Sequence, residues 1–192
     1  RWHDYWTTGT FTQTISVNAD DSVSYSAGGS VTWQPNSVFN EMYFGRSGSS
    51  FFGNIHSLMS FSTEGTIPRN ATITSATLKV TKHGSSGSSP NFSIGAQAID
   101  SAALPSISNN PNAGGWTMTT ARATRTDVPA DGEISIDVKA TLQEAVSRVG
   151  WDKGRINLFV IDNQGSETQN NWQINDLNSG RPPSVLVVNW EK

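Results

Sequence analysis

One short stretch near the C-terminus combines the side chains that protein sites use to bind sugars. Residues 170–176 read Asn-Asn-Trp-Gln-Ile-Asn-Asp. An aromatic ring such as that of Trp172 can stack on the C–H face of a sugar, while amide and carboxylate groups hydrogen-bond to the sugar hydroxyls. We therefore take Trp172, Asn171, Gln173 and Asp176 as the first candidate carbohydrate-binding residues.

Aromatic residues elsewhere in the chain offer further contact points. The chain has seven Trp, and we add Trp33, Tyr43 with its neighbour Arg46, and Trp116, which follows a pair of glycines, to the candidate sugar-binding residues. The alternative is that these rings fill a core or cover its edges, as we expect for Trp151.

No recognisable catalytic motif accompanies the residues that could act as bases or nucleophiles. His3, His56 and His83 lack a nucleophile motif nearby. A glycosidase needs two carboxylates about 5–10 Å apart, and Asp162 and Asp176 are the strongest acidic candidates. We expect no catalytic residues, and a polysaccharide-cleaving enzyme is the weakest alternative.

Acidic residues near predicted strand ends raise the question of a metal. Asp20, Asp21, Asp100 and Asp162 lie at such places, where oxygen ligands could hold calcium. The spacing of known calcium loops is missing, and Asp also caps turns without any metal. We expect no cofactor and leave a structural calcium ion open.

The chain begins with an aromatic segment that we interpret as an N-terminal arm. Residues 1–10 form this arm, and residues 11–192 form a single domain. Trp2, Tyr5 and Trp6 give the arm three aromatic rings within six residues, and aromatic residues are enriched at interfaces. These three are our candidate interface residues. The arm could dock on another subunit or domain, or fold back on its own domain.

Composition excludes several classes of protein. The formal net charge is −3 with only 15% charged residues, so the chain lacks the basic surface of proteins that bind duplex nucleic acid. The chain has no Cys, which rules out a disulfide framework and a zinc finger. No apolar run approaches the roughly 20 residues of a membrane helix, and we expect no membrane span.

Alternation of apolar and polar residues predicts many short strands. The predicted strands cover residues 11–17, 38–44, 55–61, 73–80, 92–99, 117–125, 134–138, 156–161 and 185–190. Residues 84–90, a Gly/Ser-rich run, are predicted as a loop that joins two strands. Strands and helices do not alternate along the chain, so the pattern predicts an all-β fold, an antiparallel β-sandwich of the jelly-roll type.

One short helix is predicted near residues 139–149. Asp137 or Thr141 could cap its start, and Gly150 is placed to end it in the left-handed conformation. Its apolar stripe has the spacing of one helix face. The stripe consists of Leu142, Ala145, Val146 and Val149.

Three segments resemble those of DNRLRE-type domains, which are noncatalytic β-sandwich modules of secreted bacterial and archaeal proteins. They are Phe61-Ser-Thr-Glu-Gly-Thr-Ile-Pro-Arg-Asn-Ala-Thr-Ile-Thr-Ser-Ala-Thr-Leu-Lys-Val80, then Ile136-Asp-Val with the helix and Gly150-Trp151, and finally Arg181-Pro-Pro-Ser-Val-Leu-Val-Val188. This resemblance implies a β-sandwich and, for some family members, carbohydrate binding. The Trp usual in the strand before the helix is replaced, since residues 120–125 contain no aromatic residue.

Two functions follow from these observations. The first is a noncatalytic carbohydrate-binding module, extracellular, whose partner is a polysaccharide or a cell-surface glycan. The second is a structural protein of a virion or other surface appendage, for example a capsid decoration or fibre subunit, whose partners are copies of itself or other subunits. The resemblance favours the first function and the aromatic arm favours the second.

Overall fold

The fold was taken from a computed structural model, which describes residues 7–16, 21–27, 30–35, 41–46, 55–63, 65–100, 102–103, 116–151, 154–164 and 169–192. For residues 21–27, 30–35, 55 and 56 only the backbone is described. The aromatic residues of the predicted arm, Trp2, Tyr5 and Trp6, lie outside this part of the chain.

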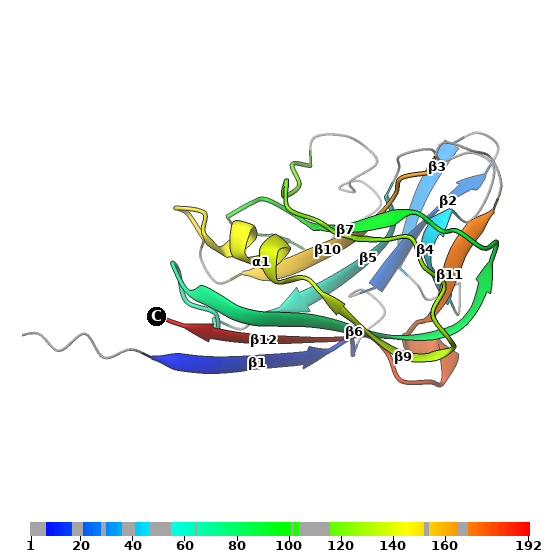
Figure 1. Cartoon of the computed structure of the whole chain (residues 1–192). Coiled ribbons are helices and arrows are strands. Elements are labelled where there is room, and N and C mark those ends of the chain that lie inside the picture. The colour runs from blue at the N-terminus through cyan, green and yellow to red at the C-terminus, as the bar shows by residue number, and fades with distance from the viewer. Residues whose placement is uncertain are drawn as a thin grey trace, which may run out of the picture.

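Two antiparallel sheets form the molecule (Figure 1). The first sheet has the strand order β1-β12-β6-β11-β4, with β9 also paired to β6, and the second has the order β3-β2-β5-β10-β7-β8. The strands are β1 Thr8–Thr14, β2 Asp21–Ala27, β3 Ser30–Pro35, β4 Glu41–Arg46, β5 Ile55–Ser62, β6 Thr72–Ser86, β7 Phe92–Ala96, β8 Ala123–Arg125, β9 Gly132–Asp137, β10 Arg155–Asp162, β11 Asn170–Asn175 and β12 Val185–Glu191. The expected all-β, sandwich-like fold with one short helix is confirmed.

The long strand β6 organises the first sheet. Lys79 pairs with β9 on one side and with β12 on the other, and Lys82 pairs with β9 and with β11. β12 and β11 therefore lie end to end along the same side of β6. Between them the chain leaves the sheet through the 3₁₀ helix η3, Leu177–Ser179, and returns as β12. This excursion leaves polar side chains at the junction of β4, β6 and β11.

A hydrophobic core fills the space between the sheets. Alternate residues of β12 are buried, as its sequence pattern predicts. Phe44 of β4, Phe92 of β7 and Trp172 of β11 form an aromatic group whose ring centroids lie 4.9–6.5 Å apart. These three rings join the two sheets, because β4 and β11 belong to the first sheet and β7 to the second.

The helix α1, Lys139–Val146, lies between β6 and β7 at one end of the sandwich (Figure 1). Asp137 accepts a hydrogen bond from the Lys139 backbone N–H at 2.8 Å. Gly150 does not adopt a positive φ, so the predicted left-handed stop is wrong. Gly150 lies against the Asp100 carboxylate, where a Cβ would collide. The helix ends at Val146, and Val149 is 87% exposed, outside the buried stripe.

Candidate functional site

A polar pocket lies on the outer face of the first sheet, where β4, β6 and β11 meet. Met42 and Ile174 point into the core and are fully buried. Because neighbouring residues of a strand point to opposite faces, Glu41 and Asn175 point outward, and these two residues are paired in the ladder between β4 and β11. The sheet thus holds their side chains side by side.

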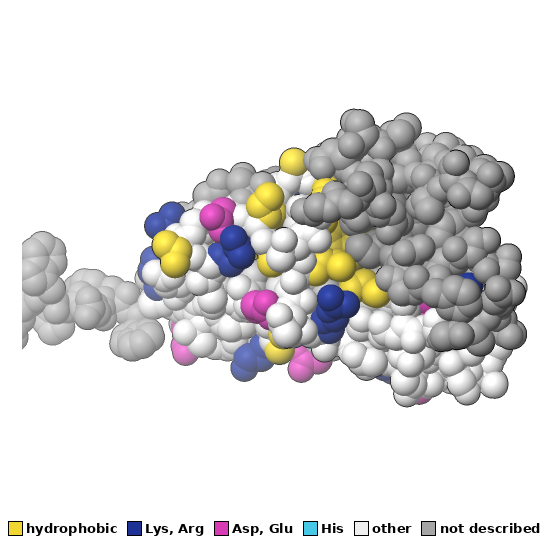
Figure 2. All heavy atoms as spheres, turned by 90° about the horizontal axis from the view of Figure 1, so that it is seen from above, with side chains coloured by type: hydrophobic (Ala, Val, Ile, Leu, Met, Phe, Trp, Pro, Cys, Tyr) yellow, Lys and Arg dark blue, Asp and Glu magenta, His cyan; other side chains and the backbone are white. Residues whose placement is uncertain are grey.

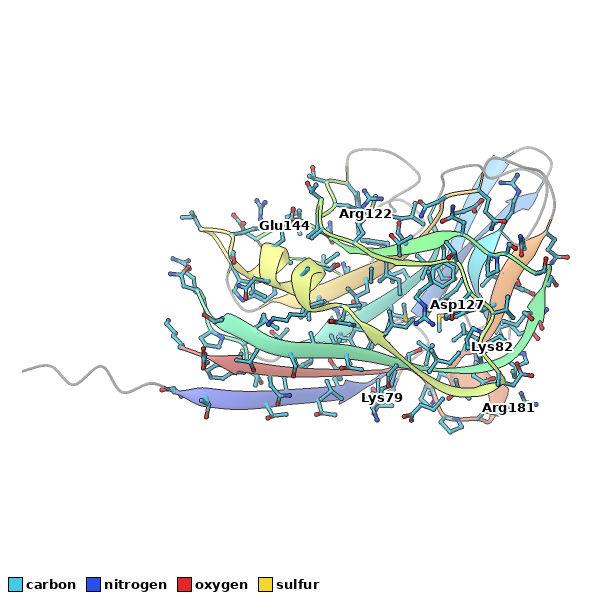
Figure 3. The ribbon with its side chains drawn as sticks, viewed as in Figure 1. Lys79, Lys82, Arg122, Asp127, Glu144 and Arg181 are labelled. Carbon is cyan, nitrogen blue, oxygen red and sulfur yellow. The ribbon has the colours of Figure 1, made fainter. Side chains whose placement is uncertain are left out.

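The pocket has a volume of about 220 Å³, and we call it the outer pocket. Figure 3 shows Arg181 near η3, at the end of the sandwich that also holds Lys82. The chain reaches Arg181 through η3 and Gly180, which adopts a left-handed conformation with φ 69°. The outer pocket is lined by Glu41, His83, Asn175, Ser179 and Arg181.

Glu41 connects the groups on one wall of the outer pocket. Its Oε1 lies 3.1 Å from His83 Nε2, and its Oε2 accepts a hydrogen bond of 3.0 Å from the Tyr43 hydroxyl. Burial, that hydrogen bond and the charge of Glu41 raise the pKa of Tyr43 to about 12. Tyr43 therefore keeps its proton at neutral pH, and the Glu41 carboxylate is held in one orientation as an acceptor.

Asn175 is the pocket residue whose hydrogen-bonding capacity is least used. Its side chain is fully buried, and neither Nδ2 nor Oδ1 has a hydrogen-bond partner within the described residues. A buried amide without partners costs about 1–3 kcal/mol. Because the side chain has no exposed surface, its amide is not open to a ligand in this structure.

Asp176 follows Asn175 where the chain leaves β11, and its side chain is fully buried. Burial raises the pKa of the Asp176 carboxyl, an effect that the backbone N–H groups of Asn178 and Ser179 oppose and the charge of Glu41 reinforces. The Ser179 hydroxyl donates to the Asp176 backbone carbonyl at 2.8 Å. The two carboxylates thus act on each other across this region, which favours a ligand with donor groups.

Three of the residues predicted to bind sugar come together at this junction. Tyr43 and Asp176 adjoin the outer pocket as described. Gln173 is paired with Tyr43 in the ladder, and its side chain lies over Gly84, which has no Cβ to obstruct it. The sheet therefore brings Tyr43, Gln173 and Asp176 to the same end of β4 and β11, but none of the three lines the outer pocket itself.

Trp172, the centre of the predicted sugar-binding stretch, is a core residue. Its side chain is fully buried against Phe44 and Phe92. Its Nε1 donates to the Asp127 backbone carbonyl at 2.8 Å, and the Arg125 guanidinium lies 5.1 Å from its ring centroid. The ring has no free face for a sugar, because residues 170–175 form a strand and Trp172 falls on its inward side.

Arg46 and Asn171 take part in buried polar contacts that join β4, β10 and β11. Arg46 Nη1 lies 3.0 Å from Asp162 Oδ2, and both side chains are fully buried. The Asn171 amide donates to the Arg46 backbone carbonyl at 2.6 Å. The Gln164 backbone N–H donates to Asp162 Oδ1 at 3.0 Å. These contacts link β4, β10 and β11 and leave Arg46 and Asn171 without access to a sugar.

Trp116 lies elsewhere, on the second sheet. It is half-buried and meets Phe159 edge to face, with ring centroids 5.4 Å apart. With Met118 it packs on a small apolar group formed by Leu58, Phe159 and Ile161. In the view of Figure 2, hydrophobic side chains gather beside the residues that are not described. Trp116 thus partly fits the alternative interpretation, that aromatic rings cover an edge of the core.

The remaining predicted residues are only partly described. Trp33 lies in β3, of which only the backbone is described. Asp100 pairs with Arg148 at 2.7 Å, and Asp162 with Arg46. Asp20 lies outside the described residues, and Asp21 is described by its backbone alone. Among the described residues no group of three or more acidic, His or Cys side chains could hold a metal ion.

The sequence analysis missed most residues that line the outer pocket. Glu41 is not among the predicted residues, and His83 is considered there only as a catalytic base that lacks a nucleophile motif nearby. The missing signal was the alternation in residues 170–175, where Trp172 and Ile174 face the core and Asn175 the outside. Read as a strand, the stretch places Asn175 on the face opposite to Trp172.

Comparison of the chain with models of known protein families finds no family that matches, and comparison with curated proteins finds no similar sequence. The likeness to DNRLRE-type domains thus rests on the sequence motifs and stays a prediction. In the described part of the chain, no helix has the length and apolar character needed to span a membrane.

Proposed function

We propose that this protein is a noncatalytic, extracellular carbohydrate-binding module and that the outer pocket binds the sugar. The observation that carries the proposal is the Glu41 carboxylate, which lines the pocket, is 35% exposed and is held by contacts with Tyr43 and His83. Sugar hydroxyls both donate and accept hydrogen bonds, so they can donate to this carboxylate.

Other residues of the outer pocket complement this carboxylate. Glu41 supplies carboxylate acceptors whose orientation is set by His83 and Tyr43. The side chain of Arg181, which also lines the pocket, supplies donors. A neutral polyhydroxyl ligand can use these donors and acceptors together without leaving a buried charge unpaired.

The size of the outer pocket limits what it can hold. Its volume of about 220 Å³ lies below the roughly 300–1,000 Å³ of pockets that enclose drug-sized ligands. We therefore infer that one sugar unit of a glycan enters the pocket and that the rest of the glycan runs over the sheet surface.

A binding screen tests the proposal. The intact chain is run in affinity gels that contain soluble polysaccharides and is applied to a glycan array. We expect retention by at least one polysaccharide, with no release of reducing ends in a parallel turnover assay. Absence of binding to every glycan contradicts carbohydrate binding, and release of reducing ends contradicts the noncatalytic role.

A further inference from the structure

The edge strands of the two sheets differ in how they are protected against pairing with another chain. Unprotected edges expose backbone N–H and C=O groups, and proteins usually cover them or place charges, proline or short strands there. β3 ends in Pro35, β8 has only three residues, and β9 carries Glu133. At β4, Ser57 Oγ bonds to both the N–H and the C=O of Tyr43.

β1 has none of these protections in the described part of the chain. Its sequence, Thr-Gly-Thr-Phe-Thr-Gln-Thr, contains no charge and no proline. Its pairing with β12 runs without a bulge from Thr8 to Thr14. Figure 1 shows β1 at the rim of the first sheet, with β12 beside it. Of the edge strands described, β1 combines a length of seven residues and a regular pairing with β12 with the absence of any protecting feature.

The hydrogen-bond pattern shows which groups of β1 point to the free side. Thr7 and Lys192 exchange two backbone hydrogen bonds of 2.7 and 2.8 Å, and the Ile15 N–H donates to the Ser184 carbonyl at 3.0 Å. Odd-numbered residues therefore direct their backbone groups toward β12. The residues that direct theirs away from β12 are Thr8, Thr10, Thr12 and Thr14.

A groove lies beside this edge. It has a volume of about 320 Å³ and is lined by residues 10–13 of β1 together with Ser62, Thr63 and Thr66. Gln13 lines the groove, and its Oε1 is buried without a hydrogen-bond partner among the described residues. The edge therefore has a polar groove beside it.

We propose that β1 pairs antiparallel with β1 of a second copy of this chain, around a two-fold axis at Phe11. In this register Thr8 lies opposite the Thr14 of the second copy, and Thr10 opposite its Thr12. All four threonines then form hydrogen-bonded pairs, and the two first sheets become one continuous sheet. The inference does not depend on sugar binding.

The sequence of β1 favours a second copy over another partner. An isologous interface must be self-complementary, and the register places only threonines opposite each other at the hydrogen-bonded positions. Opposed threonines are favourable cross-strand pairs, and like charges opposite each other are unfavourable. Because β1 has no charge, two copies meet without repulsion between the paired strands.

Sedimentation velocity of the intact chain, at concentrations from roughly 10 µM to 1 mM, tests the pairing, because one strand pair is smaller than a standard stable interface. We expect a dimer that grows with concentration. Thr12→Pro removes an N–H that points away from β12, so it abolishes the dimer while the monomer folds. Thr12→Val keeps the backbone donor and keeps the dimer.

Disulfide trapping tests the register without relying on Thr12→Pro. The chain has no Cys, so single substitutions give clean cross-links. Paired residues at hydrogen-bonded positions have Cα atoms about 5.5 Å apart, within disulfide range. Thr10→Cys mixed with Thr12→Cys should cross-link, and Thr10→Cys alone should not. A strict monomer at every concentration, or equal cross-linking in both samples, overturns the proposal.

Discussion

Glu41 Oε1 lies 3.1 Å from His83 Nε2, a contact that joins β4 to β6 across the intervening strand β11. The other oxygen of Glu41 accepts the hydrogen bond of Tyr43. One carboxylate thus fixes two side chains at the wall of the outer pocket. For the ligand that we propose, an acceptor already held in place would reduce the entropy lost on binding.

The pKa of Tyr43 reports on this arrangement without any ligand. Glu41→Gln removes the charge that helps hold the Tyr43 pKa at about 12. We expect the pKa to fall but to stay above the ordinary value of about 10, because burial, its main cause, remains. Ultraviolet titration, with Tyr43→Phe to assign the signal, measures it. An unchanged pKa contradicts the contact, and Glu133→Gln on β9 is the matched control.

Replacement of Trp172 separates a core role from a sugar-binding role. Trp172→Phe loses the hydrogen bond to the Asp127 carbonyl and leaves a cavity beside Phe44. We expect the free energy of unfolding to fall by about 2–4 kcal/mol, with glycan affinity unchanged for the folded protein. Urea denaturation and calorimetric titration measure the two quantities. Lost affinity with unchanged stability contradicts the core assignment.

The buried Arg46–Asp162 pair predicts a non-additive effect of substitution. Arg46→Met leaves the Asp162 carboxylate buried without its cation and should cost about 3–5 kcal/mol of stability. Arg46→Met combined with Asp162→Asn should recover much of this loss, because no uncompensated charge remains. A double-mutant cycle by urea denaturation tests this coupling. Additive losses contradict it.

Asp176 predicts a pH dependence of stability. Its folded-state pKa is raised above 3.8, chiefly by burial, so the folded protein favours the protonated form. The free energy of unfolding therefore decreases as pH rises from about 3.8 through the folded-state pKa. Asp176→Asn lacks this decrease, so relative to the parent protein it should be more stabilising at pH 7 than at pH 3.

Asp127 serves as a control for that measurement, because its contribution to stability depends on pH in the opposite direction. The hydrogen bond from Arg125 lowers the pKa of Asp127, so its contribution to stability is present above pH 3.8 and is lost as pH falls through the folded-state pKa. Asp127→Asn should be more destabilising at pH 7 than at low pH. Urea denaturation at pH 3 and at pH 7 measures how much each substitution changes the free energy of unfolding. If this effect shifts in the same direction between the two pH values for both variants, the two assignments are contradicted.

Strands with clear alternation were predictable from the sequence. Val185–Glu191 alternates in burial as its residues do, and Arg155–Asp162 was recognised from its apolar run. Residues 117–125 were predicted as one strand, but only Ala123–Arg125 is a strand, with a single bridge at Met118. Thr119 explains this break, because its hydroxyl bonds to the Ala96 N–H and to the Ala121 carbonyl and so bends the chain.

The candidate site was less predictable, because it depends on which face of the sheet a residue occupies. Within the predicted stretch 170–176, Asn175 lines the outer pocket and Trp172 is a core residue. Residues 8–10, assigned to the arm, lie in β1. Pairing of Glu41 with Asn175 depends on a register between strands more than 100 residues apart, which local patterns cannot supply.

The central claim is that the outer pocket binds a sugar, and calorimetric titration of Glu41→Ala with the polysaccharide retained in the binding screen tests it most directly. We predict a loss of affinity of about 10- to 100-fold, the cost of one or two hydrogen bonds to a charged acceptor. Asn189→Ala, on the outer face of β12 and away from the pocket, is the control and should bind as the parent protein does. Unchanged affinity in folded Glu41→Ala would contradict the assignment of the outer pocket.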